Sequence, residues 1–239
     1  MRFFTLFLLI AVASASAARG QEPPDTNYDE SKVPAYVLPD PLVCGDGRAV
    51  TDAKMWREVR RPEILRAFAT SVYGHTPRLA TQVRFESTGI EPKALGGLAT
   101  RKEVRIRLFA EADAPWIDLL LFIPNAGPKP VPVFLGLNYG NQGVHADPAI
   151  APSREARVQR GEHSARWPLE LLLKRGYAVA SFHGGDIELD PYGSGCQYTP
   201  EAWKKGVRGY VLAKEGRTDL ADDEWGSIGV WAWGLSRAM

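Results

Sequence analysis

The feature that most constrains the fold is a strand–helix–strand succession in the middle of the chain. The apolar run VPVFLGLNYG (131–140) is followed, after a long loop, by RWPLELLLKRG (166–176) and then by YAVASF (177–182). Pro168 suits the first helical position of the middle segment, and Gly176 suits its end. Two buried strands joined by a helix form a parallel βαβ unit with helices on the faces of the sheet. The chain is therefore predicted to be an α/β protein with a parallel centre.

Further strands and a helix are predicted before this unit. The segments TQVRFES (81–87) and RKEVRIRLFA (101–110) alternate apolar and polar residues, which is typical of half-exposed strands. The run WIDLLLFIP (116–124) is almost continuously apolar and predicts a strand covered on both faces. A two-part helix between residues 51 and 74, ended or restarted at Pro62, is expected to pack on the core. These strands make a mixed sheet with an antiparallel N-terminal part.

The N-terminus predicts export. Arg2 precedes an apolar run over residues 3–13, and the small residues 15–17 (Ala-Ser-Ala) fit a cleavage site. Residues 1–18 are therefore predicted to be a signal peptide, with a transmembrane anchor as the alternative, and the mature protein is expected to be secreted or periplasmic. Residues 19–50 are interpreted as an extended leader, and residues 51–239 as the folded domain.

Composition and spacing argue against several classes of function. The formal net charge is +1, so no basic surface for nucleic acid or membranes is indicated. The sequence has no P-loop, dinucleotide fingerprint or zinc spacing, and no cofactor or metal is expected. The four histidines are scattered, and most tryptophans occupy positions typical of core packing. The two cysteines, Cys44 and Cys196, could form a disulfide in an oxidising compartment, but their spacing alone does not establish one.

The segment GLSRA at residues 234–238 resembles the Gly-x-Ser-x-Gly elbow that carries a nucleophilic serine. An elbow follows a strand, whereas the apolar residues around Ser236 recur at steps of three and four, which is helical spacing. These residues are Trp225, Ile228, Ala232, Leu235 and Met239. A short strand is the alternative, because residues 231, 233 and 235 also alternate. In a helix, the serine hydroxyl bonds back to a carbonyl one turn earlier. Ser236 is therefore predicted to be structural.

Two loops are candidates for a binding site. The segment GLNYGNQG (136–143) follows the strand before the crossover, and the carboxyl ends of strands face the ligand crevice of an α/β sheet. Asn138, Tyr139 and Asn141 are therefore predicted to border a pocket, as hydrogen bonders or as supports for the loop. The segment FHGGD (182–186) resembles an oxyanion loop, but it follows the strand after the crossover and ends in a charge. Asp186 is predicted to border the same pocket, and an ordinary glycine turn is the alternative interpretation of this loop.

Four stretches resemble the glucuronoyl esterases, carbohydrate esterase family 15 of the α/β-hydrolase superfamily. They run in family order over most of the mature chain and comprise RRPEILRAFATSVYGHTP (60–77), VFLGLNYGN (133–141), RWPLELLLKRGYAVA (166–180) and DEWGSIGVWAWGLSRAM (223–239). The family nucleophile lies in Gly-Cys/His-Ser-Arg-x-Gly, which Leu235 and Met239 fail to match. The resemblance implies that the Trp-Ala-Trp-Gly segment is the helix before the nucleophile strand, so that no catalytic residue lies within this chain.

The resemblance also implies a fold and a function. The fold would be an incomplete α/β-hydrolase-like three-layer sandwich that ends before the nucleophile strand. The whole protein would hydrolyse glucuronoyl esters of plant cell-wall glucuronoxylan, including lignin–carbohydrate esters, by serine acylation. An acetyl-xylan or other carbohydrate esterase on the same scaffold is one alternative. A non-catalytic truncated homologue or sugar-binding fragment is another.

Overall fold

The computed structural model describes residues 27–79, 81–191 and 199–239. The chain divides into two units, Met1–Leu38 and Pro39–Met239. In the first unit, the described residues contain a short 3-10 turn, Glu30–Lys32, capped by the side chain of Asp29. The strands and α-helices of the described residues lie in the second unit, and no helix among them is long and apolar enough to cross a membrane. The predicted signal peptide, residues 1–18, lies outside the described residues.

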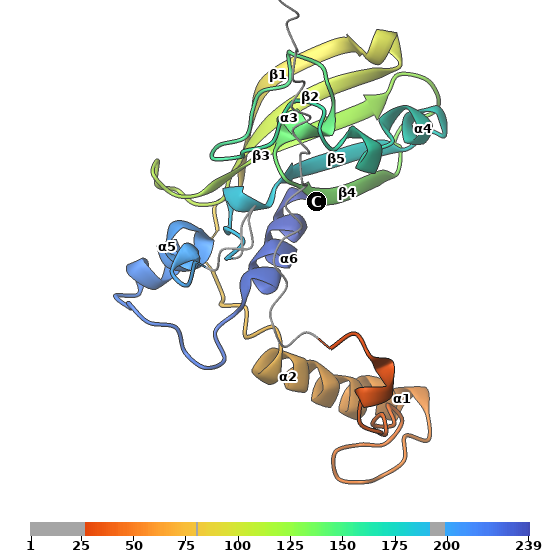
Figure 1. The fold of residues 1–239 in the computed structure, drawn as a ribbon, viewed down its shortest axis with the longest axis vertical. Coiled ribbons are helices and arrows are strands. Elements are labelled where there is room, and N and C mark those ends of the chain that lie inside the picture. The colour runs from red at the N-terminus through yellow and green to blue at the C-terminus, as the bar shows by residue number, and fades with distance from the viewer. Residues whose placement is uncertain (1–26, 80, 192–198) are drawn as a thin grey trace, which may run out of the picture. The chain divides into compact units, whose positions relative to one another are not determined.

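A five-stranded mixed sheet forms the centre of the second unit (Figure 1). Its strands are β1 (Arg84–Ala94), β2 (Ala99–Arg107), β3 (Trp116–Pro124), β4 (Val133–Asn138) and β5 (Ala178–His183), in the spatial order β1-β2-β3-β5-β4. Neighbours are antiparallel except β4 and β5, which are parallel as the strand–helix–strand pattern predicts. The prediction of a parallel centre was wrong for the described sheet. The parallel pair lies at its edge, because β3 runs antiparallel against β5.

The two edge strands are more exposed than the sequence predicts. The first strand begins at Arg84 and continues to Ala94, with register shifts between Ser87 and Gly89 and between Glu91 and Ala94. Almost all of β1 is exposed. The apolar run of β4 predicts cover on both faces, yet Val133 and Phe134 are 52% and 51% exposed. Among the described residues, β4 has a partner strand on one side only.

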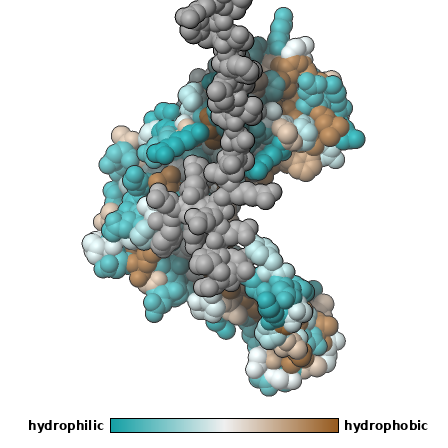
Figure 2. Space-filling view, viewed as in Figure 1, coloured by the Kyte–Doolittle hydropathy of each residue, from teal (hydrophilic) through white to brown (hydrophobic). Residues whose placement is uncertain are grey.

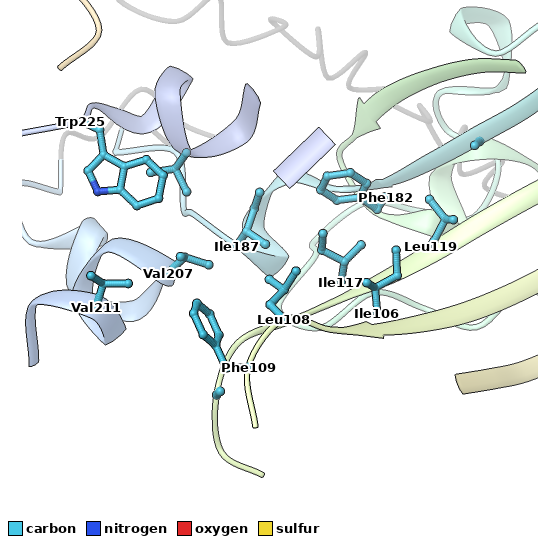
Figure 3. Close-up of a cluster of buried hydrophobic side chains, with 13 residues drawn as sticks. Ile106, Leu108, Phe109, Ile117, Leu119, Phe182, Ile187, Val207, Val211 and Trp225 are labelled. Carbon is cyan, nitrogen blue, oxygen red and sulfur yellow. The ribbon is translucent and has the colours of Figure 1, made fainter. Parts of the chain in front are cut away.

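Helices pack on both faces of the sheet. One face carries an apolar cluster shared with α5 (Val207–Lys214) and α6 (Ser227–Ala238). Figure 3 shows Leu108, Phe109 and Ile187 of this cluster between the strand residues and the α5 residues Val207 and Val211. The opposite face carries a second cluster shared with α4 (Leu169–Lys174), which contains Leu120, Phe122, Val179, Leu169 and Leu173. Gly176 ends the α4 segment with φ +83°, as predicted.

The N-terminal helical segment differs from its prediction. It is continuous over α1 (Ala53–Met55), a π-helical turn (Trp56–Arg60) and α2 (Arg61–Ser71), with Pro62 in the first turn of α2. The expected packing on the core was wrong, since no residue of α2 is buried. Its apolar positions Leu65, Phe68 and Val72 are 50%, 46% and 60% exposed, because the described chain brings no apolar element against this side of the helix.

Helix α6 forms where the periodicity predicts a helix, but only part of the predicted stripe is buried. Val230 and Gly234 face the sheet, while Ile228 is 60% exposed and Met239 is 95% exposed. Of the predicted stripe, Trp225 and Leu235 join the core, whereas Ile228 and Ala232 border an open apolar groove of about 440 Å³. The groove is lined by Tyr73, Thr76, Ile228, Gly229, Ala232, Trp233 and Ser236. The start of α6 is tied to the segment after α2, since Gly226 N donates to Tyr73 O at 2.8 Å.

Candidate functional site

The candidate crevice of this fold is the region outside the carboxyl ends of β4 and β5, which are parallel neighbours. After β4, the chain crosses through α4 on one face of the sheet, and after β5 it continues to α5 and α6 on the other face. In α/β proteins, ligands bind where two connections leave adjacent strand ends toward opposite faces of the sheet. Asn138 of β4 is aligned with His183 of β5, so the loops after these two residues border the crevice.

The loop after β4 is held by buried amide side chains. Asn138 Nδ2 donates to Asn141 Oδ1 at 2.8 Å and to Ser181 Oγ at 2.9 Å, while its Oδ1 accepts from Gly140 N at 2.8 Å. Asn141 Nδ2 donates to Asp118 O at 2.8 Å and so joins the loop to β3. Asn138 and Asn141 are 6% and 4% exposed. The sequence left two roles open, ligand hydrogen bonding and support of the loop. The hydrogen bonds of Asn138 and Asn141 support the loop backbone.

Tyr139 differs from its two neighbours. It is 59% exposed and follows β4 directly, so it lies at the carboxyl end of that strand with its ring open to solvent. Its ring centroid lies 5.3 Å from that of His163, and the guanidinium of Arg166 lies 5.7 Å from its centre. A large apolar ring with a polar tip and a nearby cation is a surface on which a ligand can bind.

The loop after β5 contains a buried carboxyl group. Gly184–Asp186 form a 3-10 turn, and Asp186 Oδ2 accepts from Asp118 N at 3.0 Å. Asp186 Oδ1 has no hydrogen-bond partner among the described residues, and the nearest cation is Arg154, whose Nη2 lies 3.8 Å away. Burial raises the pKa of Asp186 to about 7, against the lowering effect of the Asp118 amide. The loop thus contains a buried carboxyl group whose charge changes near neutral pH.

A small polar cavity of about 190 Å³ lies on the α4 side of this region and is lined in part by Glu103, Arg105, Asp118, Asn141 and Arg154. Arg105 binds Asp118 through Nε at 2.8 Å and Nη2 at 3.3 Å. The guanidinium of Arg154 lies 3.6 Å from the ring centre of Trp116, and its Nη2 donates to Trp116 O at 2.9 Å. The charges around this cavity are largely paired within the protein.

The histidines do not form a metal centre. His183 Nδ1 lies 3.3 Å from Asn138 O, and burial lowers its pKa, so the ring is neutral near pH 7. His145 accepts a hydrogen bond from Asp147 N at 3.1 Å, and His75 lies 3.8 Å from Asp223. Within the described ranges, no group of three or more His, Cys, Asp or Glu residues could hold a metal ion.

Ser236 lies inside α6, as the periodicity predicts. Its Oγ donates to Trp233 O at 2.7 Å, which is the backbone bond expected of a helical serine. Its assignment as a residue outside the catalytic machinery stays a prediction. Cys44 is buried, at 3% exposure, while Cys196 lies outside the described residues, so the pairing of the two cysteines also stays a prediction.

The sequence analysis missed the residues that reach this region from irregular loops. Ser153 Oγ accepts from Asn141 N at 2.9 Å, and Arg154 covers Trp116. These loop residues follow no apolar periodicity, so no pattern marks them. Trp116 was expected in the core, but it is partly exposed and stacked by Arg154, whereas Trp225 is fully buried as expected.

Comparisons with known proteins place the chain in a family. It is 37% identical over 237 residues to Carbohydrate esterase MZ0003 from an unknown prokaryotic organism. The alignment covers 91% of this chain and 52% of that protein. The solved structure of a glucuronoyl esterase from Solibacter usitatus is 40% identical, with a TM-score of 0.74 over 87% of this chain and 54% of the other. The chain belongs to the glucuronoyl esterase family, carbohydrate esterase family 15.

A promiscuous esterase of the same family from a marine bacterial metagenome is 38% identical, with a TM-score of 0.71 over 89% of this chain and 54% of that one. No family model matches the chain. The chain spans about half the length of the glucuronoyl esterase relatives that it matches, and it corresponds to their N-terminal part.

Proposed function

We propose that this chain is the scaffold half of a secreted glucuronoyl-type carboxylic ester hydrolase. Its substrate would be an ester of a 4-O-methyl-glucuronoyl side chain of xylan, including esters with lignin alcohols. A serine outside residues 1–239 would attack the ester carbonyl while a histidine takes its proton. Water would then hydrolyse the acyl-enzyme and release the acid. The membership of the chain in the glucuronoyl esterase family supports the ester class.

The observation that carries this proposal is the open edge of β4. Helix α4 carries the chain from β4 to β5 across one face of the sheet, and α6 lies on the other face, in contact with β4. Parallel crossovers are right-handed, so a strand that follows a helix on this second face must move back past β4 and pair with its free edge. Figure 1 shows the end of α6 beside β4, where such a strand would begin.

A strand at that position would complete the site. Its carboxyl end would lie beside the loop that begins at Tyr139, so a serine on the following turn would face the crevice. The exposed apolar side chains of Val133 and Phe134 would be covered by the same addition. In this arrangement the sheet becomes the middle layer of a three-layer α/β-hydrolase-like sandwich, and Ser236 remains in the helix that precedes the nucleophile strand.

The test is to extend the reading frame past the codon for Met239, express the extended protein and assay hydrolysis of the methyl ester of 4-O-methyl-glucuronate. We expect the extended protein to hydrolyse this ester. The Ser236→Ala substitution should change the rate by less than about twofold, because Ser236 bonds only within its helix. A preference for acetylated xylan would favour the acetyl-xylan alternative. A stop codon directly after Met239 would overturn the proposal in favour of a non-catalytic homologue.

A further inference from the structure

We propose that Glu188 and Arg208 are positioning residues for α6, because their buried ion pair fixes the start of this helix relative to the end of β5. Glu188 lies in the loop after β5 and is fully buried, and Arg208 lies in α5 and is 8% exposed. The inference rests on the proposed function for its catalytic consequence alone, since a nucleophile strand after α6 would take its position from that helix. Hereafter this ion pair is called the α6 anchor.

The guanidinium of Arg208 joins three parts of the fold. Its Nη2 donates to Glu188 Oε1, in the loop after β5. Its Nη1 donates to Trp225 O at 3.0 Å, and its Nη2 also donates to Ser227 Oγ at 3.4 Å, at the start of α6. The rigid fork of the guanidinium therefore holds α5, the loop and α6 in one arrangement.

The carboxylate of Glu188 lies at the starts of two helices. Helices α5 and α6 begin after Gly206 and Gly226, and neither of these cap residues supplies a side-chain hydrogen bond. A Cβ at position 206 would lie 2.6 Å from Glu188 Oε2, so the missing side chain leaves room for the carboxylate. Ser227 Oγ lies 3.5 Å from Glu188 Oε1. The first turn of a helix carries a partial positive charge, and one buried anion lies beside two such turns here.

The backbone next to the carboxylate also contacts both helices. Ile187 O accepts from Val207 N of α5 at 2.6 Å, and Glu188 O accepts from Trp231 Nε1 of α6 at 2.9 Å. The side chain of Ile187 lies against Gly234, where a Cβ would approach it to 2.1 Å. Figure 3 shows Ile187 in the apolar cluster near Val207. Two consecutive loop residues thus contact both helices, and the ion pair adds charged groups to this contact.

The chain between the two helices does not fix the position of α6. Residues 215–223 are exposed and contain no helix or strand, and Figure 1 shows this connection looping away from both helices. The hydrogen bond from Gly226 N to Tyr73 O joins α6 to the segment after α2 and not to the sheet. Apolar packing of Val230 is non-directional, so it tolerates sliding of the helix. The directional bonds of Glu188 and Arg208 are therefore the contacts that specify where α6 starts.

A positioning role differs from a stabilising one in what happens when both charges are removed. A buried ion pair repays its desolvation only in part, so apolar residues of similar volume often leave stability unchanged or raise it. Glu188 Oε2 and Arg208 Nε have no hydrogen-bond partner among the described residues, so the desolvation of this pair is not fully compensated. An apolar pair would keep the packing and lose the directional bonds. Stability and the position of α6 can therefore be separated by experiment.

The experiment replaces both charges together, as Glu188→Met with Arg208→Met, in the 239-residue chain. Hydrogen exchange is measured at pH 8, because burial raises the pKa of Glu188 to about 7, against the opposing charge of Arg208. The carboxyl group of the natural protein is ionised above that value. We expect the amides of residues 230–234 to exchange about tenfold faster, while the amides of β2 and β3 are unchanged. The midpoint of urea denaturation should not fall.

The matched control is an exposed ion pair on the same helix α5, between Lys214 and Glu111. Lys214→Met with Glu111→Met should change neither the exchange of α6 nor the urea midpoint. If the natural chain does not fold alone, the same measurements are made on the extended protein.

Three results would overturn the α6 anchor. One is faster exchange of α6 and the sheet together with a lower midpoint, because the pair would then only stabilise the fold. Failure of the Glu188→Met, Arg208→Met protein to fold would overturn it for the same reason. Unchanged exchange of α6 would show that other contacts set the position of the helix.

Catalysis by the extended protein gives a second readout. Glu188→Met with Arg208→Met should lower kcat about tenfold and leave KM within about twofold, because a displaced nucleophile affects the chemical step more than binding. Val211→Ala removes buried apolar surface from α5 without removing a charge. It should lower the urea midpoint and leave kcat unchanged. An active extended protein whose kcat does not respond to loss of the ion pair would overturn the positioning role.

The α6 anchor and the proposed function fail in different ways. If α6 exchanges faster in the doubly substituted chain but the extended protein hydrolyses no ester, the proposed function is wrong and the anchor stands. If the ester is hydrolysed and the loss of both charges changes neither exchange nor kcat, the function stands and the anchor is wrong.

Discussion

At Gly74 the backbone adopts a conformation and a spacing that glycine alone tolerates. Its φ is +77°, and a Cβ at this position would lie 2.1 Å from Glu224 O. The close approach lets His75 N donate to Asp223 O at 2.9 Å and joins the end of α2 to the start of α6. A residue with no side chain is therefore the point of contact between two elements that are distant in sequence, α2 and α6.

We expect Gly74→Ala to lower the free energy of unfolding by more than about 2 kcal/mol, because the methyl group adds a backbone clash to the cost of a positive φ. Gly47→Ala is the matched control: its φ is +86°, but a Cβ there would meet nothing within 4 Å. Gly47→Ala should lower the free energy of unfolding by only about 1 kcal/mol, which is the cost of a positive φ without a clash. Urea denaturation of the three proteins measures both values, and equal losses would contradict the account.

The buried carboxyl of Asp186 makes stability depend on pH. Its pKa is about 7 when folded, raised by burial, and near 4 when unfolded. Between these values the folded protein binds more protons than the unfolded chain, so stability falls as pH rises from about 4 to about 7. The slope from one such group is at most about 1.4 kcal/mol per pH unit.

Asp186→Asn removes this contribution while keeping an oxygen that can accept from Asp118 N. We expect the variant to gain stability relative to the natural protein as pH rises from 4 to 7, and the difference to level off above pH 7. Thermal denaturation at several pH values provides the measurement. If the difference in stability between the two proteins stays constant from pH 4 to pH 7, Asp186 is ionised over this whole range.

At the scale of elements, the sequence analysis succeeded where regular apolar patterns decide the structure. The parallel pair β4–β5, its crossover helix α4 and the helix α6 follow from apolar runs and from Gly176. The buried side of α6 was predicted only in part, because Trp225 and Leu235 of the expected stripe join the core while Ile228 and Ala232 line the groove with Tyr73. The exposure of α2 was also missed, since an amphipathic pattern does not say whether a partner is present in the same chain.

The candidate site was predicted only from its place in the topology. Asn138, Tyr139 and Asn141 were found because they follow a strand of the crossover. The sequence could not distinguish buried supports from an exposed ring, since all three are ordinary loop residues. Ser153, Arg154 and Arg166 come from the irregular segment between β4 and α4, where only the folded backbone brings them near.

The loop after β4 depends on one buried amide. Asn141→Ala would leave the Asp118 carbonyl and the Asn138 amide without this partner, so we expect a loss of about 2–3 kcal/mol of stability. The exposed Gln82→Ala serves as a control and should change stability by less than about 0.5 kcal/mol. Chemical denaturation measures both, and a similar small change in the two variants would mean that the amide network does not hold the loop.

At the scale of the whole molecule, several apolar surfaces are left open. They are the groove between the segment after α2 and α6, the exposed side of α2, and the free edge of β4. Figure 2 shows apolar residues among polar ones on the surface of the described chain. In the proposed function, these surfaces would be covered by the part of a glucuronoyl esterase domain that lies outside residues 1–239. An uncovered strand edge of this kind pairs readily with other chains.

We expect the isolated 239-residue chain to associate as its concentration rises, and Val133→Lys to increase its soluble fraction, because a charge on an edge strand opposes pairing. Val37→Lys, at a position that is 95% exposed in the first unit, should have little effect. Analytical ultracentrifugation distinguishes the variants. A monomeric chain with cooperative unfolding at all concentrations would contradict the view that these surfaces need covering.

We propose that these residues support an esterase without containing its nucleophile. The most direct measurement is the rate at which the purified 239-residue chain and its Ser236→Ala variant hydrolyse the methyl ester of 4-O-methyl-glucuronate. The account predicts that neither protein exceeds the rate in buffer, because Ser236 donates to Trp233 O inside a helix. Hydrolysis by the chain that disappears in Ser236→Ala would show that the nucleophile lies in this chain after all.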